Sequence, residues 1–147
     1  MLEDRKYYGE KVDVCILHEG VVDCAPRPIP RKIRNLISAL PEFLKNLIIK
    51  FIHNNRSKIQ NLGVKYYLTK PDKFYESYKV MVSQMLNDSK KVYLINIAPT
   101  NEKTENHPPG FTKSIKKYNK IIKEIVNEIN SPKLFLIDLY SIISTSD

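Results

Sequence analysis

Three short runs of apolar residues along the chain predict β-strands. Each run is rich in β-branched and aromatic side chains and is bounded by Gly, Pro, Ser or Asp, which are common where strands end. Such near-continuous apolar runs are typical of strands that are buried on both faces. The predicted strands cover residues 12–17, 91–97 and 134–138.

Between these runs, apolar residues recur at every third or fourth position, which predicts helices. Proline is tolerated in the first turn of a helix, so Pro41 can begin the second of them. We expect Thr69 to cap the third, with a stripe of Tyr and Met side chains that serves as core. The predicted helices cover 31–40, 41 to about 60, a segment that follows Thr69, and 112–129.

Helices that separate apolar strands predict an α/β fold with a parallel sheet and right-handed crossovers. The length of 147 residues suits one domain over 1–147. A sheet of three strands has open, apolar edges, which favour pairing with other chains. We therefore expect self-association, or a complementing chain, through those edges.

After the first predicted strand we expect a Pro-rich, irregular loop over 18–30. It is the best candidate for a binding site, because ligands bind at the carboxyl ends of parallel strands. Gly20 either lets a substrate approach the backbone or supplies a turn with positive φ. Asp23, His18 and Glu19 are substrate-binding or catalytic candidates, although a structural role is favoured for Asp23 and His18. Arg27 is the strongest candidate, since its guanidinium can bind a carboxylate or phosphate in bidentate fashion.

A second loop follows the strand at 91–97 and reaches the same edge of the predicted sheet. His107 in this loop is a further substrate-binding candidate, although the segment Asn106–Gly110 also has the composition of an exposed turn. We expect Asn119 and Asp138 to hold loops and helix ends in place.

Composition narrows the classes of protein that fit. The net charge of +8 would suit an anionic partner. The lysines are scattered, however, and no nucleic-acid motif is present, so we favour solvated helix faces over a nucleic-acid site.

No stretch is apolar enough to span a membrane. The charged segment 1–11 does not resemble a secretory signal, and Cys15 and Cys24 suggest reduced thiols, so we expect a cytoplasmic protein. We expect no metal and no cofactor.

The motifs in their order resemble those of the SGNH (GDSL-type) hydrolases, over about residues 10 to 140. The segment Gly20-Val-Val-Asp23 resembles the G-x-N-D motif of that family, and the continuation to Arg27 is similar to a variant subgroup. The strand at 92–97, which ends in Ala98-Pro99, and the helix around Tyr118-Asn119 are also similar to later parts of such a domain.

The resemblance implies a three-layer α/β/α, flavodoxin-like fold and the hydrolysis of esters, plausibly acyl or acetyl groups on a saccharide or lipid. In such enzymes a serine is the nucleophile, a D-x-x-H segment supplies the base, and G-x-N-D helps to stabilise the oxyanion. By this motif match, Gly20 and Asp23 fall at catalytic-site positions.

The chain also departs from the family pattern. It has no G-D-S before Val12 and no D-x-x-H, and Val22 stands at the position of the motif's asparagine. We therefore expect an incomplete domain, a piece of a longer hydrolase with little or no activity alone. The alternative is a non-catalytic binding or scaffold protein of the same fold, in which Arg27 holds an anionic glycan or a lipid head group.

Overall fold

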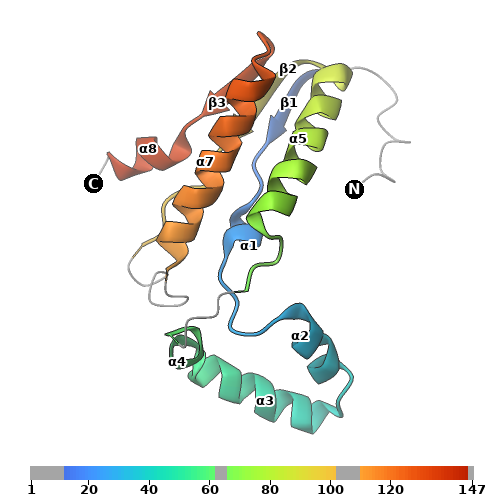
Figure 1. The fold of residues 1–147 in the computed structure, drawn as a ribbon, viewed down its shortest axis with the longest axis vertical. Coiled ribbons are helices and arrows are strands. Elements are labelled where there is room, and N and C mark those ends of the chain that lie inside the picture. Colours follow the sequence, from blue (N-terminus) through green and yellow to red (C-terminus); the bar gives the residue numbers. More distant parts are fainter. Residues whose placement is uncertain (1–11, 62–65, 102–109, 146–147) are drawn as a thin grey trace.

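The computed structural model describes residues 12–61, 66–101 and 110–145. Three strands and several helices alternate along the described chain (Figure 1). In order they are β1 (Val12–Leu17), α1 (Val21–Cys24), α2 (Arg31–Ser38), α3 (Glu42–Asn54), α4 (Arg56–Asn61), α5 (Pro71–Asp88), β2 (Ser89–Ile95), α7 (Phe111–Ile129), β3 (Leu134–Ile137) and α8 (Leu139–Ser144).

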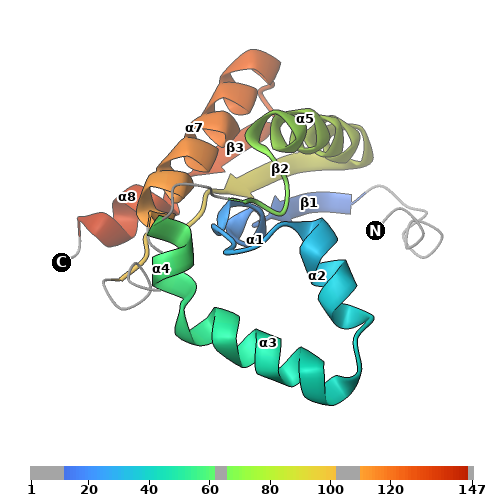
Figure 2. The same cartoon turned by 60° about the horizontal axis from the view of Figure 1, so that its bottom comes forward.

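The sheet is parallel, with strand order β1-β2-β3, and this confirms the predicted α/β class. Helices α1 to α5 lie between β1 and β2 in the chain, and α5 leads directly into β2. Helix α7 connects β2 to β3. Because the strands follow one another in sequence order, crossovers of one hand bring both helices to the same face of the sheet. Figure 2 shows α5 and α7 side by side on that face.

The core lies between this face of the sheet and the two helices. Leu17, Val92 and Leu94 project from the strands toward the helices and are buried. An aromatic cluster closes one end of this core, where the ring of Phe74 lies 5.0 Å from that of Tyr78 and 4.9 Å from that of Tyr118. Their centroid distances are typical of tilted aromatic pairs. The predicted Tyr and Met stripe of α5 is therefore core, as expected.

The opposite face of the sheet is apolar and exposed. Val14 and Ile16 on β1 are 49% and 63% exposed, and Phe135 on β3 is also exposed. The register places Ile16, Tyr93 and Phe135 in one row across the three strands. The rings of Tyr93 and Phe135 stack at 5.1 Å. Among the described residues, helices cover one face of the sheet and leave this second face open to solvent.

Helices α2, α3 and α4 form an arm that projects away from the sheet (Figure 1). The prediction of one helix from 41 to about 60 is wrong, because the helix is interrupted at Asn55. The Asn55 carboxamide donates to the carbonyl of Phe51 at 2.9 Å, and its backbone N–H donates to the same carbonyl at 3.0 Å. A short polar side chain that competes for backbone groups in this way favours the end of a helix.

Two local predictions near the sheet are also wrong. Residues 18–30 do not form a fully irregular loop, because the turn of helix α1 lies within them. Thr69 does not cap α5; Lys70 occupies the N-cap without a side-chain hydrogen bond, and Pro71 begins the helix. The Thr69 hydroxyl instead donates to Asp23 Oδ1 at 2.5 Å. A tertiary hydrogen bond has thus replaced the local capping bond.

The carboxyl ends of β2 and β3 are held by side-chain hydrogen bonds. Asn119 on α7 accepts from the Ile97 N–H and donates to the Ile97 carbonyl, both at 2.8 Å. Asp138 accepts from Asn96 at 2.6 Å and from the backbone N–H of Ser141 at 3.1 Å, which caps α8. These contacts confirm the predicted structural roles of Asn119 and Asp138.

Candidate anion-binding site and the loop after the first strand

Gly20 lies three residues after β1 and is the N-cap residue of helix α1. Its φ of 111° lies in the left-handed region, which glycine adopts at little cost. A Cβ atom at this position would lie 3.1 Å from both Ile97 Cδ1 and Phe74 Cζ. The predicted role of Gly20 as a turn residue with positive φ is thus confirmed, and close packing adds a second reason for glycine here.

Asp23 and Val22 follow Gly20 in helix α1 and differ in their surroundings. Asp23 is half-buried, and its carboxylate accepts from the hydroxyl of Thr69, which lies 46 residues later in the chain. The bond ties α1 to the segment that precedes α5. Val22, at the position of the asparagine in the G-x-N-D motif, is exposed.

The other candidates of this loop lie nearby without forming a cluster. His18 is exposed and Glu19 is partly buried. Burial, together with the nearby charge of Glu19, raises the pKa of Tyr78. The Tyr78 hydroxyl is itself buried, and it has no hydrogen-bond partner within the described ranges. His107 lies outside the described residues.

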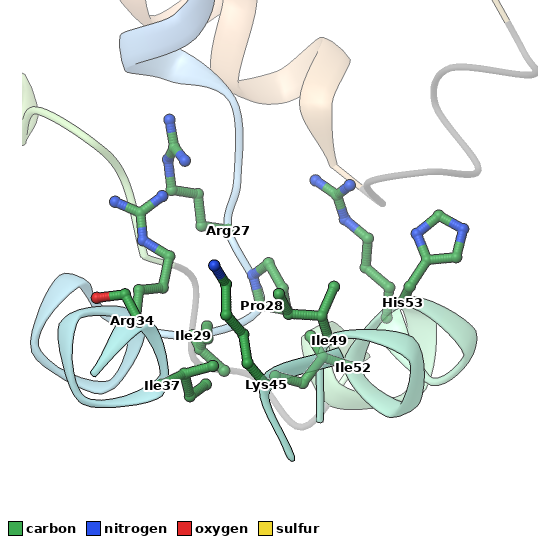
Figure 3. A pocket seen from close by; sticks show the side chains of 11 residues that line it. Arg27, Pro28, Ile29, Arg34, Ile37, Lys45, Ile49, Ile52 and His53 are labelled. Carbon is green, nitrogen blue, oxygen red and sulfur yellow. The ribbon is translucent and has the colours of Figure 1, made fainter. Parts of the chain in front are cut away.

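A pocket of about 350 Å³ lies between the arm and the segment that follows α1. It is lined by three arginines, a lysine and a histidine, together with isoleucines, a proline and a serine. In Figure 3 the cationic ends of Arg27, Arg34 and Lys45 point the same way, and Ile37 and Ile52 lie below them. The lining residues are Arg27, Pro28, Ile29, Arg34, Ile37, Ser38, Lys45, Ile49, Ile52, His53 and Arg56.

Helical periodicity gathers the lining side chains on the arm. Residues 45, 49, 52 and 53 of α3 are spaced four, seven and eight positions apart, so they share one face of the helix. Arg34 and Ile37 of α2 are three positions apart and also share a face. Arg27 comes from the preceding segment, where its backbone N–H donates to the Tyr66 carbonyl at 2.7 Å.

The arginines of the pocket repel one another. Partial burial lowers the pKa of Arg27, and the charges of Arg34 and Arg56 lower the pKa further, while Asp23 acts in the opposite direction. The two neighbouring guanidinium groups therefore disfavour the charge of the partly buried Arg27. A bound anion would relieve this repulsion.

The same arginines hold unused hydrogen-bond donors. The Nε atoms of Arg27, Arg34 and Arg56 are buried, and none has a partner in the described part of the chain. Arg56 Nη2 makes one long bond of 3.4 Å to the carbonyl of Pro26. Buried donors are nearly always paired in folded proteins, and an unpaired one costs about 1–3 kcal/mol. A bound oxyanion would offer acceptors to the guanidinium groups that carry these Nε atoms.

Of the pocket residues, only Arg27 was identified from the sequence. The cations of the arm belong to the scattered basic residues that were interpreted as solvated. The sequence does contain a pattern that indicates this part of the pocket, since Lys45 and His53 share one face of α3 with Ile49 and Ile52. The pairing of that face with α2 depends on the bend between the helices, which the sequence does not specify.

Among the described residues, no three His, Cys, Asp or Glu side chains lie close enough to hold a metal ion. The same residues include no helix with the length and apolar character that a membrane span requires. Ser114, a buried serine on α7, donates to the Cys24 carbonyl at 2.5 Å and so serves the packing of α1. No family model, curated protein or solved structure matches the chain.

Proposed function

We propose that this chain is a binding protein for an anionic ligand, which it holds in the pocket between α2, α3 and α4. The observation that supports this proposal most is that three guanidinium groups, those of Arg27, Arg34 and Arg56, line one cavity. Their buried Nε atoms have no hydrogen-bond partner among the described residues. Arginine presents a planar fork of donors that matches the oxygens of a carboxylate or phosphate.

The pocket offers more positive charge than its own structure neutralises. Lys45 and His53 line it beside the arginines, and the lining includes no acidic side chain. The charge of Asp23 raises the pKa of Arg27, while the Asp23 carboxylate accepts a hydrogen bond from the Thr69 hydroxyl. An anion therefore enters a site whose donors are already gathered, which reduces the entropic cost of ordering them on binding.

Titration calorimetry with inorganic phosphate tests this function. Arg34→Gln removes a pocket guanidinium, and Arg31→Gln removes the same charge from an exposed position on the same helix. Charge-assisted hydrogen bonds contribute about 1.5–3 kcal/mol, so we expect Arg34→Gln to weaken binding about ten- to hundredfold. Arg31→Gln should bind nearly as the parent does. Equal losses in both variants would show that only net charge matters and would contradict the site.

Ester hydrolysis is a second candidate function, which the resemblance to the SGNH hydrolases suggests. Gly20 supports it in one respect, because it lies with positive φ just after the carboxyl end of β1, where the family has its G-x-N-D motif. Labelling by a serine-directed fluorophosphonate is the direct test. Stoichiometric labelling of one serine would favour the hydrolase, and no labelling of the folded chain would leave the binding protein as the better account.

We also propose a cytoplasmic location. Cys15 and Cys24 form no disulfide with each other, which agrees with a reducing compartment. Labelling of Cys15 in intact cells, by a thiol reagent that crosses membranes and not by one that does not, would agree with this location.

A further inference from the structure

We infer that the anion bound in the arginine pocket carries an aliphatic chain, and that the ligand is a phosphate monoester of an aliphatic alcohol. The inference rests on the function proposed above and assigns the class of ligand to that site. It follows from the size of the pocket, from the chemistry of its walls and from its charge, which are taken in turn.

The pocket is larger than a small inorganic anion needs. Its volume of about 350 Å³ lies in the range of sites that bind organic molecules. Below the cations, the walls are formed by Ile29, Ile37, Ile49 and Ile52. Phosphate alone would leave this apolar region filled with water, whereas an aliphatic group would displace that water at a gain.

The walls do not suit a sugar. Hydroxyl groups require acceptors as well as donors, and the eleven lining residues include no carboxylate and no carboxamide. The one lining hydroxyl, that of Ser38, already donates to the Asn35 carbonyl at 2.7 Å. The lining side chains therefore offer few acceptors to the hydroxyls of an anionic glycan, whereas an aliphatic chain needs none.

The charge of the pocket favours a dianion. Three arginines and Lys45 line it, and the charge of Asp23 acts on Arg27 among them. A carboxylate ligand would neutralise one of these cations. A phosphate monoester carries close to two charges at neutral pH and offers three acceptor oxygens, so it can neutralise more of these cations.

The chain of such a ligand can leave the pocket beside Ile49. This residue lines the cavity, yet it is 47% exposed, so it stands where the cavity meets solvent. A long chain can thus continue outward. The ligand can be the head group of a membrane lipid that ends in a phosphate monoester, or a soluble alkyl phosphate of the same chemistry.

Calorimetric titration with inorganic phosphate, butyl phosphate and octyl phosphate, below the concentration at which micelles form, tests the ligand class. A buried methylene contributes up to about a fourfold gain in affinity, so we expect octyl phosphate to bind at least tenfold more tightly than butyl phosphate. Equal affinities for all three would overturn the inference and leave the proposed anion site intact. Absence of binding by all three would overturn both.

Two matched variants test where the alkyl chain of the ligand lies. Ile49→Ser changes the pocket mouth, and Leu47→Ser makes the same kind of change at a residue of α3 that is 61% exposed and does not line the pocket. We expect Ile49→Ser to weaken octyl phosphate at least about fivefold more than it weakens inorganic phosphate. Leu47→Ser should alter neither. Equal effects of the two variants on octyl phosphate would overturn the inference.

Sedimentation with vesicles distinguishes the two sources. One set contains phosphatidic acid in phosphatidylcholine and the other contains phosphatidylglycerol, a diester, at equal charge. Retention on phosphatidic acid alone, and its loss in Ile49→Ser, supports a membrane lipid. Binding to soluble octyl phosphate with no retention on either vesicle supports a soluble ligand. Equal retention on both vesicles, unaffected by Ile49→Ser, contradicts recognition of the monoester.

Discussion

Individual residues around α1 are fixed by close packing. Gly20 turns the chain with φ of 111° against Phe74 and Ile97, and Cys24 is fully buried a turn later. Asp23 between them is bonded to Thr69. This short segment directs the backbone that leads to Arg27. The geometry of the segment therefore determines where the first arginine of the pocket lies.

We predict that Gly20→Ala destabilises the fold by about 1–3 kcal/mol. Alanine disfavours positive φ, and its Cβ would press on Phe74 and Ile97. The free energy of unfolding in urea measures the effect. Val21→Ala, at an exposed neighbouring position, should change it by less than about 0.5 kcal/mol. Similar losses in both variants would contradict the packing argument.

We predict that Cys24 resists alkylation in the folded protein. Burial raises the pKa of Cys24 to about 12, so at pH 8 about one thiol in ten thousand is the reactive thiolate. The folded state favours the neutral thiol of Cys24. This contribution to the free energy of unfolding is complete below the ordinary thiol pKa and is lost as the pH rises toward 12. Iodoacetamide labelling with peptide mapping measures this. Modification of native Cys24 at the rate seen in urea would be the contrary result.

At the scale of elements, side-chain hydrogen bonds hold the backbone in place beyond the end of strand β2. β2 ends at Ile95, and two residues later Asn119 of α7 pairs with both backbone groups of Ile97. This contact holds the carboxyl end of β2 against the helix, beside the turn at Gly20. The helix therefore fixes the edge of the sheet from which the loops leave.

We predict that Asn119→Ala costs about 2–4 kcal/mol. It would leave the N–H and carbonyl of Ile97 unpaired, and each buried unpaired group costs about 1–3 kcal/mol. Thermal and urea unfolding measure the loss. Lys116→Ala, at an exposed position on the same helix, is the control and should be nearly neutral. A loss below 1 kcal/mol for Asn119→Ala would show that water replaces the carboxamide.

The sequence predicts the elements of the sheet better than those of the arm. The strand β1 and the helix α7 follow from apolar runs and periodicity, because their partners lie in one buried core. The interruption at Asn55 depends on the competition for one carbonyl of Phe51, which the apolar stripe does not encode. Of the pocket arginines, only Arg27 was predicted, because Arg34 depends on the bend between α2 and α3, and Arg56 follows the interruption at Asn55.

At the scale of the molecule, two surfaces stand out from an ordinary solvated exterior. One is the arginine pocket, and the other is the open face of the sheet. Helices α5 and α7 lie side by side on one face of the sheet (Figure 2). Parallel sheets are normally covered on both faces, yet here Ile16 and Phe135, which share one row across the strands, are exposed. An apolar surface of this kind favours contact with another chain.

We predict that the chain self-associates through this face, and that Ile16→Lys weakens the association. A charge in the centre of the apolar row opposes its burial. Val80→Lys makes a similar change at a residue of α5 that is 57% exposed, away from the open face. Sedimentation velocity over a range of concentrations measures both. A parent chain that stays monomeric, or equal effects of the two variants, would contradict the prediction.

The measurement that tests the central claim most directly is the NMR spectrum of the arginine Nε–H groups during a phosphate titration. The account predicts that the signals of Arg27, Arg34 and Arg56 shift and saturate together, because these donors gain an acceptor. The exposed Arg31 serves as the internal reference and should stay in place. Signals that do not move, or that all drift equally with ionic strength, would contradict an anion site in this pocket.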